Sequence, residues 1–270
     1  MRLVQFHRGG EGGVRVGVEQ AEGQGVIDLK AFDPSMPSTM RQFLEMGQKG
    51  MDCAKRALSS GQHVVERSDI RLLSPVTGPE KVVCVGMNYK DHCLEQNAPI
   101  PEEPIIFSND SPYYRITTLY ETDSCSKVDW EVELAFVIGR KGKHIKEEEA
   151  LSYVAGFTVA NDVSAHDWQM KRNGKQWLLG KTFDTFGPLG PALVTTAALK
   201  AIFLVKHVHN LGIRCLVNGA ADQDSSTNQM IFRTEKLIAW VSQNPPVYLK
   251  RGDVVECQID EIGSIRNTVV

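Results

Sequence analysis

The sequence predicts an α+β protein with a small N-terminal α/β domain over residues 1–74 and a larger domain over residues 75–270. Stretches in which apolar and polar residues alternate are interleaved with stretches in which apolar residues recur at helical spacing. This periodicity stops around residues 73–79, where proline and glycine become frequent, so we expect a linker there. A chain of 270 residues is at the upper end of one domain, which favours one large domain with a small companion.

The N-terminal domain is predicted to contain a small sheet followed by two helices. Alternation typical of strands occurs in the first residues of the chain and in residues 14–18 and 25–29. Residues 38–44 and 51–58 carry apolar residues at helical spacing, and the Ser38-Thr39 segment offers a cap before Met40 for the first of these helices.

The larger domain is predicted to mix short strands with helices. Residues 81–85 form an apolar run that ends at Gly86, and the polar segment 88–95 then begins as a helix would. Residues 131–138 and 156–160 have the character of further strands. Near the C-terminus we expect a helix capped by Thr234 and carrying Leu237, Ile238 and Val241, then strands over 247–270 around the Arg251-Gly252-Asp253 turn.

Composition argues against several classes of partner. A formal net charge of -3 and a pI near 6.2 leave no broad positive face for nucleic acid. There is no run of ~18 apolar residues that could span a membrane. The N-terminus has neither a signal-peptide core nor the character of a transit peptide, so we expect no targeting segment in this chain. The six cysteines are scattered without a C-x-x-C motif, which favours a reducing compartment.

Three acidic residues form a candidate metal site. The period of two along a strand places Glu131 and Glu133 on one face, in a segment that looks buried on both sides. Asp162 ends the strand that includes residues 157–161 and is the best third ligand. Three carboxylates suit a hard cation, Mg²⁺ or alternatively Mn²⁺ or Ca²⁺. The alternatives are that the two glutamates face solvent on an edge strand or pair with lysine or arginine.

Other polar residues are weaker candidates. His92 and Glu95 are three apart, so on a helix the carboxylate could orient the imidazole as a general base, although a surface contact is the simpler explanation. Lys181 is a lone cation in an apolar run and suits an anionic substrate group. His166 and Gln169 follow Asp162 and could line the same cavity, or be ordinary surface residues. The His207-x-His209 pair lacks further ligands and is expected to be solvated.

Four motifs together resemble the fumarylacetoacetate hydrolase family, in the right order and over most of the chain. They are Val85-Gly-Met-Asn-Tyr89-Lys-Asp-His92, Asp129-Trp-Glu131-Val-Glu133-Leu, Asn161-Asp162-Val-Ser-Ala and Lys181-Thr-Phe-Asp184-x-Phe-x-Pro188-x-Gly190-Pro191. The resemblance implies a catalytic domain of mixed β-sandwich or β-roll type and a homodimer. It also implies roles for individual residues. Glu131, Glu133 and Asp162 would be metal ligands, His92 with Glu95 would form the general-base pair on a lid helix, and Gln169 and Lys181 would contact substrate.

The chain departs from the family pattern at four places. Relatives continue Phe-Ser-Lys where this chain has Phe107-Ser-Asn109-Asp, and they usually have arginine at the position of His166. The family's Thr-Gly-Thr-Pro-x-Gly loop is absent between Gln243 and Pro246, and residues 197–206 look foreign to the pattern.

The resemblance implies a substrate with a carboxylate next to a keto or enol oxygen. The leading hypothesis is metal-dependent keto-enol tautomerisation of oxaloacetate, with His92 moving the C3 proton while Lys181, Gln169 and His166 position a small 2-oxo acid. The alternatives are a hydrolase or decarboxylase that cleaves carbon-carbon bonds of acylpyruvates or β-diketo acids, and an inactive metal-binding paralogue. By the same resemblance the location is mitochondrial or, alternatively, cytoplasmic.

Overall fold

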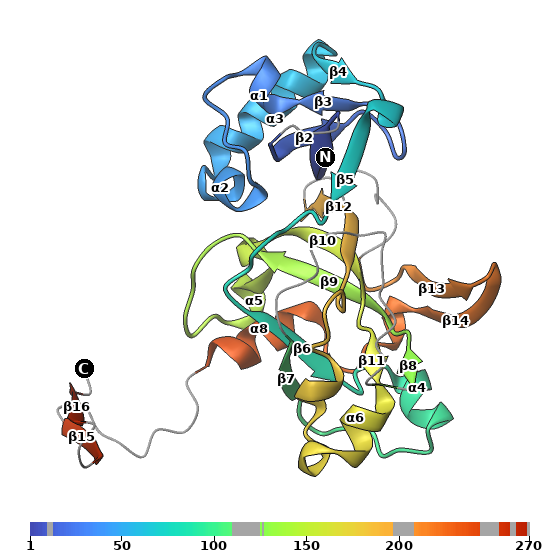
Figure 1. Cartoon of the computed structure of the whole chain (residues 1–270), viewed down its shortest axis with the longest axis vertical. Helices are drawn as coiled ribbons and strands as arrows, with labels where there is room; N and C mark the ends of the chain where they lie inside the picture. Colours follow the sequence, from blue (N-terminus) through green and yellow to red (C-terminus); the bar gives the residue numbers. More distant parts are fainter. Residues whose placement is uncertain are drawn as a thin grey trace.

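The computed structural model describes residues 1–9, 13–109, 125, 127–196, 208–243, 254–259 and 263–268 (Figure 1). Its largest element is an eight-stranded sheet in which the strands follow the order β4-β3-β2-β1-β12-β10-β9, with β5 paired to β1 off this path. The strands pair antiparallel and are accompanied by helices, which is consistent with the predicted α+β class. Within the described ranges, every helix is too short or too polar to cross a bilayer.

The N-terminal part contains the sheet and helices that its sequence predicts. The strands are β1 (Arg2–Arg8), β2 (Arg15–Glu19), β3 (Val26–Asp28), β4 (Val64–Val65) and β5 (Ile70–Leu73), and the helices are α1 (Leu29–Phe32), α2 (Met40–Glu45) and α3 (Gln48–Ser60). The Asp28 carboxylate caps α1, and the Thr39 hydroxyl accepts the Gln42 N–H at the start of α2. Gly61, in the left-handed region at φ 62°, ends α3. The two helices expected at 38–44 and 51–58 are therefore confirmed.

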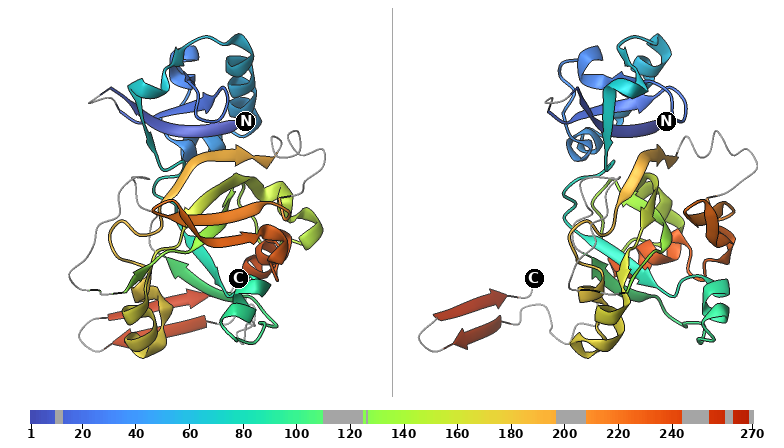
Figure 2. Two further views of the ribbon diagram at one scale, coloured as in Figure 1. Left: turned by 90° about the vertical axis from the view of Figure 1, so that its right-hand side faces the viewer. Right: turned by 45° about the vertical axis from the view of Figure 1, so that its right-hand side comes forward.

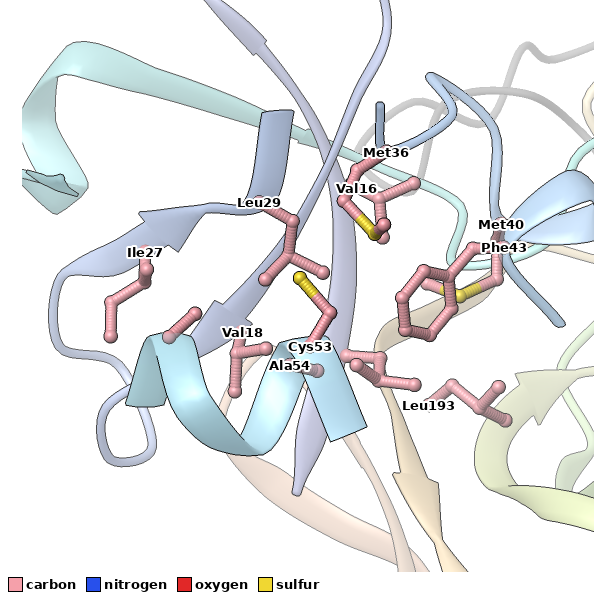
Figure 3. Packing of buried hydrophobic residues seen from close by; sticks show 12 residues of the cluster. Val16, Val18, Ile27, Leu29, Met36, Met40, Phe43, Cys53, Ala54 and Leu193 are labelled. Carbon is pink, nitrogen blue, oxygen red and sulfur yellow. The ribbon is translucent and has the colours of Figure 1, made fainter. Parts of the chain in front are cut away.

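One apolar core holds these helices on the sheet. Val16 and Val18 of β2 belong to the same apolar cluster as Met40 and Phe43 of α2, and all four are at most 1% exposed (Figure 3). Leu193 belongs to the same cluster although it lies in β12, far along the sequence. The core of the N-terminal part is therefore completed by the larger part of the chain.

The sheet itself also crosses the expected domain boundary. β1 pairs antiparallel with β12 (Leu189–Thr195), with Arg2 opposite Val194 and Leu3 opposite Leu193. β12 pairs with β10 (Val154–Asn161), and β10 pairs with the edge strand β9 (Val132–Ile138). β5 ends at Leu73, where the sequence predicts the linker, yet hydrogen bonding continues from one part to the other. The division into domains 1–74 and 75–270 remains a prediction about folding units.

The rest of the larger part surrounds the β9–β10 end of the sheet. β6 (Val82–Gly86) pairs with β7 (Ile105–Asn109), β8 (Val128–Asp129) with β11 (Ser164–Ala165), and β13 (Gly212–Val217) with β14 (Ala220–Ser226). The main helices are α4 (Lys90–Glu95), α5 (Glu147–Ala150), α6 (His166–Lys171) and α8 (Thr234–Ser242), and the 3₁₀ turn η4 spans Trp177–Gly180. β13 runs along β9 (Figure 2), and Gln223 in β14 accepts the Val132 N–H at 2.9 Å.

The strands expected at 81–85, 131–138 and 156–160 and the helices expected at 88–95 and near Thr234 are all present. The expected cap is wrong, because Thr234 is the first residue of α8 and its hydroxyl contacts His209 instead. At the C-terminus, β15 (Val254–Ile259) and β16 (Gly263–Thr268) form a hairpin that stands apart from the rest of the described chain in Figures 1 and 2. The expected turn at 251–253, the segment 197–206 and the position of the missing loop after Gln243 lie outside the described residues.

Candidate active site

Two of the predicted metal ligands meet where β9 begins and β10 ends. In this antiparallel pair Asn161 lies opposite Val132, so Glu131 and Asp162 are the next residues at the same end of the ladder. The Asp162 N–H donates to the Glu131 carbonyl at 2.8 Å, and the Glu131 N–H donates to the Asn161 side-chain oxygen at 3.1 Å. These bonds extend the pairing by one residue and fix both carboxylates at one corner of the sheet.

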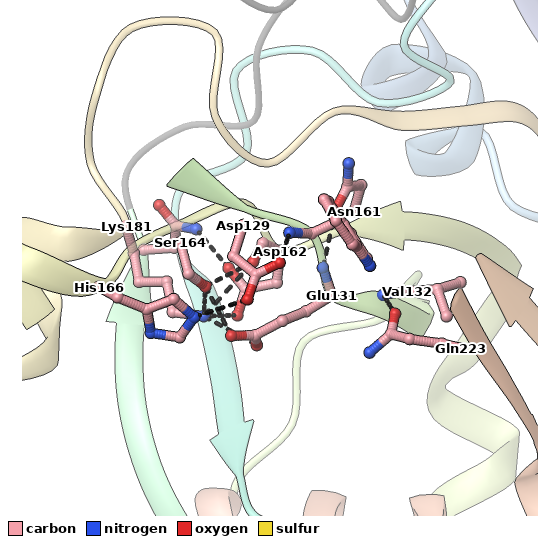
Figure 4. A network of polar contacts seen from close by, with 11 residues as sticks. Asp129, Glu131, Val132, Asn161, Asp162, Ser164, His166, Lys181 and Gln223 are labelled. Atoms are coloured by element: carbon pink, nitrogen blue, oxygen red, sulfur yellow. Dashed lines mark hydrogen bonds and ion pairs between the residues drawn. The ribbon is translucent and has the colours of Figure 1, made fainter. Parts of the chain in front are cut away.

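Lys181 places its ammonium group between these two carboxylates (Figure 4). The turn η4 ends just before it, and its Nζ lies 2.9 Å from Glu131 Oε2 and 2.9 Å from Asp162 Oδ2. The side chain is only 1% exposed. Burial alone would lower the pKa of Lys181, but Glu131 and Asp162 together raise it above its ordinary value. The ammonium therefore stays charged, as its contacts require.

Neutral groups bind the remaining oxygen atoms of the two carboxylates. The Ser164 hydroxyl accepts from Lys181 Nζ at 2.6 Å and donates to Glu131 Oε1 at 2.6 Å. At the end of β7, Asn109 Nδ2 donates to Asp162 Oδ1 at 3.3 Å. Ser164 and Asn109 were not among the predicted site residues. Ser164 lies inside one of the quoted motifs, which was the signal available for it, whereas Asn109 was noted only as a departure from the family.

Glu133 is the third predicted ligand, and its charge is poorly compensated. It lies two residues along β9, half-buried, at the edge of the sheet. Loss of hydration on burial raises the pKa of Glu133 to about 8, and the negative charges of Glu131 and Asp162 add to this effect. Burial likewise raises the pKa of Asp162, although Lys181 opposes the shift. This corner therefore contains more negative charge than one ammonium neutralises.

The donor atoms of these residues suit a divalent cation, although the side chains do not form a complete coordination site. Among the described residues, no three His, Cys, Asp or Glu side chains already surround a point that could hold a metal ion. Carboxylate oxygens are nevertheless the ligands that hard cations prefer, and Glu131 and Asp162 share a single ammonium group as their counter-ion. The sequence left open the alternative that the glutamates pair with lysine or arginine. Glu131 does form such an ion pair, with Lys181.

The segment after Asp162 brings His166 and Gln169 to the same region. His166 starts α6, and its Nε2 lies 2.9 Å from Asp129 Oδ2, with both side chains about 40% exposed. Gln169 is 7% exposed, and its backbone packs against Gly180 in η4. Both residues are thus held near Lys181, while their roles toward a substrate remain predictions. Asp129 was not predicted as a site residue, though it belongs to the same motif as Glu131.

His92 and Glu95 lie on α4 as expected. Nδ1 of His92 is 3.8 Å from Glu95 Oε2, and the side chains are 45% and 76% exposed. No described hydrogen bond links this pair to the carboxylates. Tyr89 precedes α4, and its pKa is raised mainly by burial and also by the charge of Glu133.

The expectation for the His207-x-His209 pair is wrong for His209. Its side chain is 1% exposed, and Nε2 lies 3.0 Å from the Thr234 hydroxyl at the start of α8. The turn that follows Val208 packs against this helix, so His209 is a buried structural residue. His207 lies outside the described residues.

Comparison with known proteins gives consistent matches. A family model described as fumarylacetoacetate (FAA) hydrolase, C-terminal, matches residues 81–246. The chain is 54% identical to a Xenopus laevis protein named oxaloacetate tautomerase fahd2, mitochondrial, over 294 alignment positions that cover 100% of this chain and 90% of the relative. Because this alignment is longer than the 270-residue chain, the relative has residues without a counterpart here.

Solved structures also share the fold. A fumarylacetoacetate hydrolase from the psychrophile Exiguobacterium antarcticum is 26% identical with a TM-score of 0.65, covering 100% of this chain and 99% of that one. A maleylpyruvate hydrolase from Sphingobium sp. SYK-6, determined with manganese(II) ion and pyruvate, is 23% identical with a TM-score of 0.68 over 100% of this chain and 99% of that one. At this identity the second likeness concerns the fold alone.

Proposed function

This chain belongs to the fumarylacetoacetate hydrolase family, and we propose that it is a divalent-metal-dependent oxaloacetate keto-enol tautomerase. The observation that carries the proposal is the convergence of Glu131 and Asp162 at one corner of the sheet, with Glu133 two residues from Glu131 along the chain. The name of the 54% identical Xenopus laevis relative supports the choice of substrate.

The proposed metal ligands are Glu131, Glu133 and Asp162, and Mg²⁺ is the proposed ion, with Mn²⁺ or Ca²⁺ as alternatives. When bound there, such a cation supplies an electrophile that withdraws electron density from a 2-oxo carboxylate and so makes its C3 proton easier to remove. The protein's own contribution is to hold the Glu131 and Asp162 carboxylates together at a partly buried corner, where water screens them less.

The remaining residues are assigned to the substrate. Lys181, Gln169 and His166 are proposed to position its carboxylates, because η4 and α6 bring all three to the corner that Glu131 occupies. His92, with Glu95 at 3.8 Å, is proposed to carry the C3 proton. The exposed imidazole can exchange protons with solvent, and tautomerisation requires only proton movement.

The proposal is tested by following the ultraviolet absorbance of oxaloacetate enol with the purified chain, in magnesium or in excess chelator. We expect magnesium to accelerate the decay of the enol absorbance in the presence of the wild-type protein. With a Glu131→Ala/Glu133→Ala variant, the absorbance should decay at the rate seen without protein. A matched control, Glu148→Ala/Glu149→Ala, removes two exposed carboxylates from α5 and should behave like the wild type. Wild-type turnover in the first variant, or no acceleration by folded wild-type protein, contradicts the proposal.

A second candidate is carbon-carbon hydrolysis of an acylpyruvate or β-diketo acid, favoured by the hydrolase family model that matches residues 81–246. The same metal ligands serve it, but His92 and Glu95 would activate water. Appearance of a carboxylic acid fragment would support hydrolysis, whereas enol decay without cleavage would support tautomerisation. A folded protein that binds metal without either activity would support the inactive-paralogue alternative.

We further propose a homodimer that acts on a small 2-oxo acid in mitochondria. The location is supported by the name of the Xenopus laevis relative, and the dimer by the resemblance to the family. Light scattering coupled to size exclusion should give twice the mass of 30.0 kDa, and a tagged protein should colocalise with a mitochondrial stain.

A further inference from the structure

The contacts of Lys181 use its whole capacity to donate hydrogen bonds. An ammonium group has three N–H donors. In this protein they are directed at Glu131 Oε2 at 2.9 Å, Asp162 Oδ2 at 2.9 Å and Ser164 Oγ at 2.6 Å. The side chain is 1% exposed. In this arrangement all three donors of Lys181 are bound to the proposed metal ligands and Ser164, so its proposed contact with substrate requires that one of these hydrogen bonds be released.

The surroundings of the ammonium make these contacts strong. The Nζ atom lies 5.6 Å from the centre of the Phe107 ring. Burial with an aromatic ring on one side lowers the local dielectric, so attraction to the carboxylates and repulsion from any second cation are both larger than in water. The two carboxylates that contact this one ammonium, Glu131 and Asp162, leave one negative charge at this corner that Lys181 does not neutralise.

We propose that Lys181 is an internal counter-ion that competes with the divalent metal ion, and so sets the affinity of the site for metal. The ammonium and the metal ion would neutralise the same two carboxylates, Glu131 and Asp162, so each reduces the benefit of the other. Lys181 stabilises the metal-free protein and weakens metal binding. This inference rests on the proposed function, because it takes Glu131, Glu133 and Asp162 as the metal ligands.

The test is the affinity for Mn²⁺, measured by titration calorimetry and by the electron paramagnetic resonance signal of free Mn²⁺, with no substrate present. Lys181→Met should bind Mn²⁺ more tightly than the wild type, by about tenfold or more. In chelator, Lys181→Met should melt at a lower temperature than the wild type. Added Mn²⁺ should raise the melting temperature of the variant by more than it raises that of the wild type. Lys181→Gln keeps a neutral hydrogen-bond donor and should also bind Mn²⁺ more tightly than the wild type. It replaces Lys181→Met in the test if the methionine variant does not fold.

The matched control is Lys171→Met, which removes an exposed ammonium from the last residue of α6. It should leave Mn²⁺ affinity unchanged, which separates the local effect from a change in total charge. Equal or weaker Mn²⁺ binding by both Lys181 variants would overturn the inference, because Lys181 would then act by positioning the ligands. If the wild type binds no Mn²⁺, the proposed metal-dependent function fails instead.

Discussion

Glu133 makes the stability of the metal-free protein depend on pH. Its pKa rises from an ordinary value of 4.5 to about 8 in the folded protein, mainly because burial removes water. Between these values the folded state retains a proton that the unfolded chain has lost, so the folded state binds more protons. The free energy of unfolding of the metal-free protein should therefore fall as the pH rises from about 4.5 to 8.

Glu133→Gln removes this titration and should raise the melting temperature in excess chelator at pH 8 but not at pH 4.5. Differential scanning fluorimetry across this range provides the measurement. Glu148→Gln, an exposed glutamate in α5, is the control and should follow the wild-type curve. Parallel curves for wild type and Glu133→Gln would show that Glu133 stays ionised in the metal-free fold.

At this scale the sequence identified the carboxylates but not their partner. Strand alternation and the family motifs pointed to Glu131 and Asp162, and the β9–β10 register brings them together. The contact with Lys181 could not be predicted, because it depends on where the turn η4 places a side chain that lies 50 residues beyond Glu131. Spacing along one strand contains no information about a distant turn.

The packing of η4 on α6 depends on the absence of a side chain at Gly180. A Cβ there would lie 2.7 Å from the Cβ of Gln169 and 2.9 Å from its backbone N and Cα. Because backbone atoms cannot rotate away, Gly180→Ala must shift one element against the other and displace Lys181, the next residue. We expect a loss of about 1 to 3 kcal/mol in stability and weaker oxaloacetate turnover.

Thermal melting and the kcat and KM for oxaloacetate test this prediction. Gly13→Ala provides the control, because a Cβ at that exposed position would have no atom within 4 Å. Wild-type melting and kinetics in Gly180→Ala would mean that the α6–η4 contact can open without effect on the site.

Elements with strong periodicity were predictable from sequence, and their neighbours in the sheet were not. The apolar pattern from 131 to 138 appears as β9, and the capped pattern at Thr39 and Met40 appears as α2. The expectation that β9 is buried on both sides does not hold, since Val132 to Val137 are only half-buried. β9 is the edge of the sheet, and its position in the strand order is set by long-range pairing.

For the whole molecule, β1 and β12 unite the regions that the sequence predicts as separate domains. The composition change near residue 75 does coincide with the end of β5. Nothing in that local signal could reveal that Leu3 pairs with Leu193, because the two residues lie in different expected domains. Leu193 is fully buried in the core that α2 and α3 form with β2.

Leu193→Ala should therefore destabilise both regions at once, by about 2 to 5 kcal/mol. All four tryptophans lie in the larger region, at positions 130, 168, 177 and 240, so their fluorescence in urea reports on that region alone. Hydrogen exchange of peptides from residues 1–74 reports on the other. Leu216→Ala, at a leucine that is 60% exposed in β13, should change stability by no more than about 0.5 kcal/mol. If Leu193→Ala accelerates exchange in 1–74 while the fluorescence midpoint stays fixed, the regions fold independently and the shared sheet does not couple them.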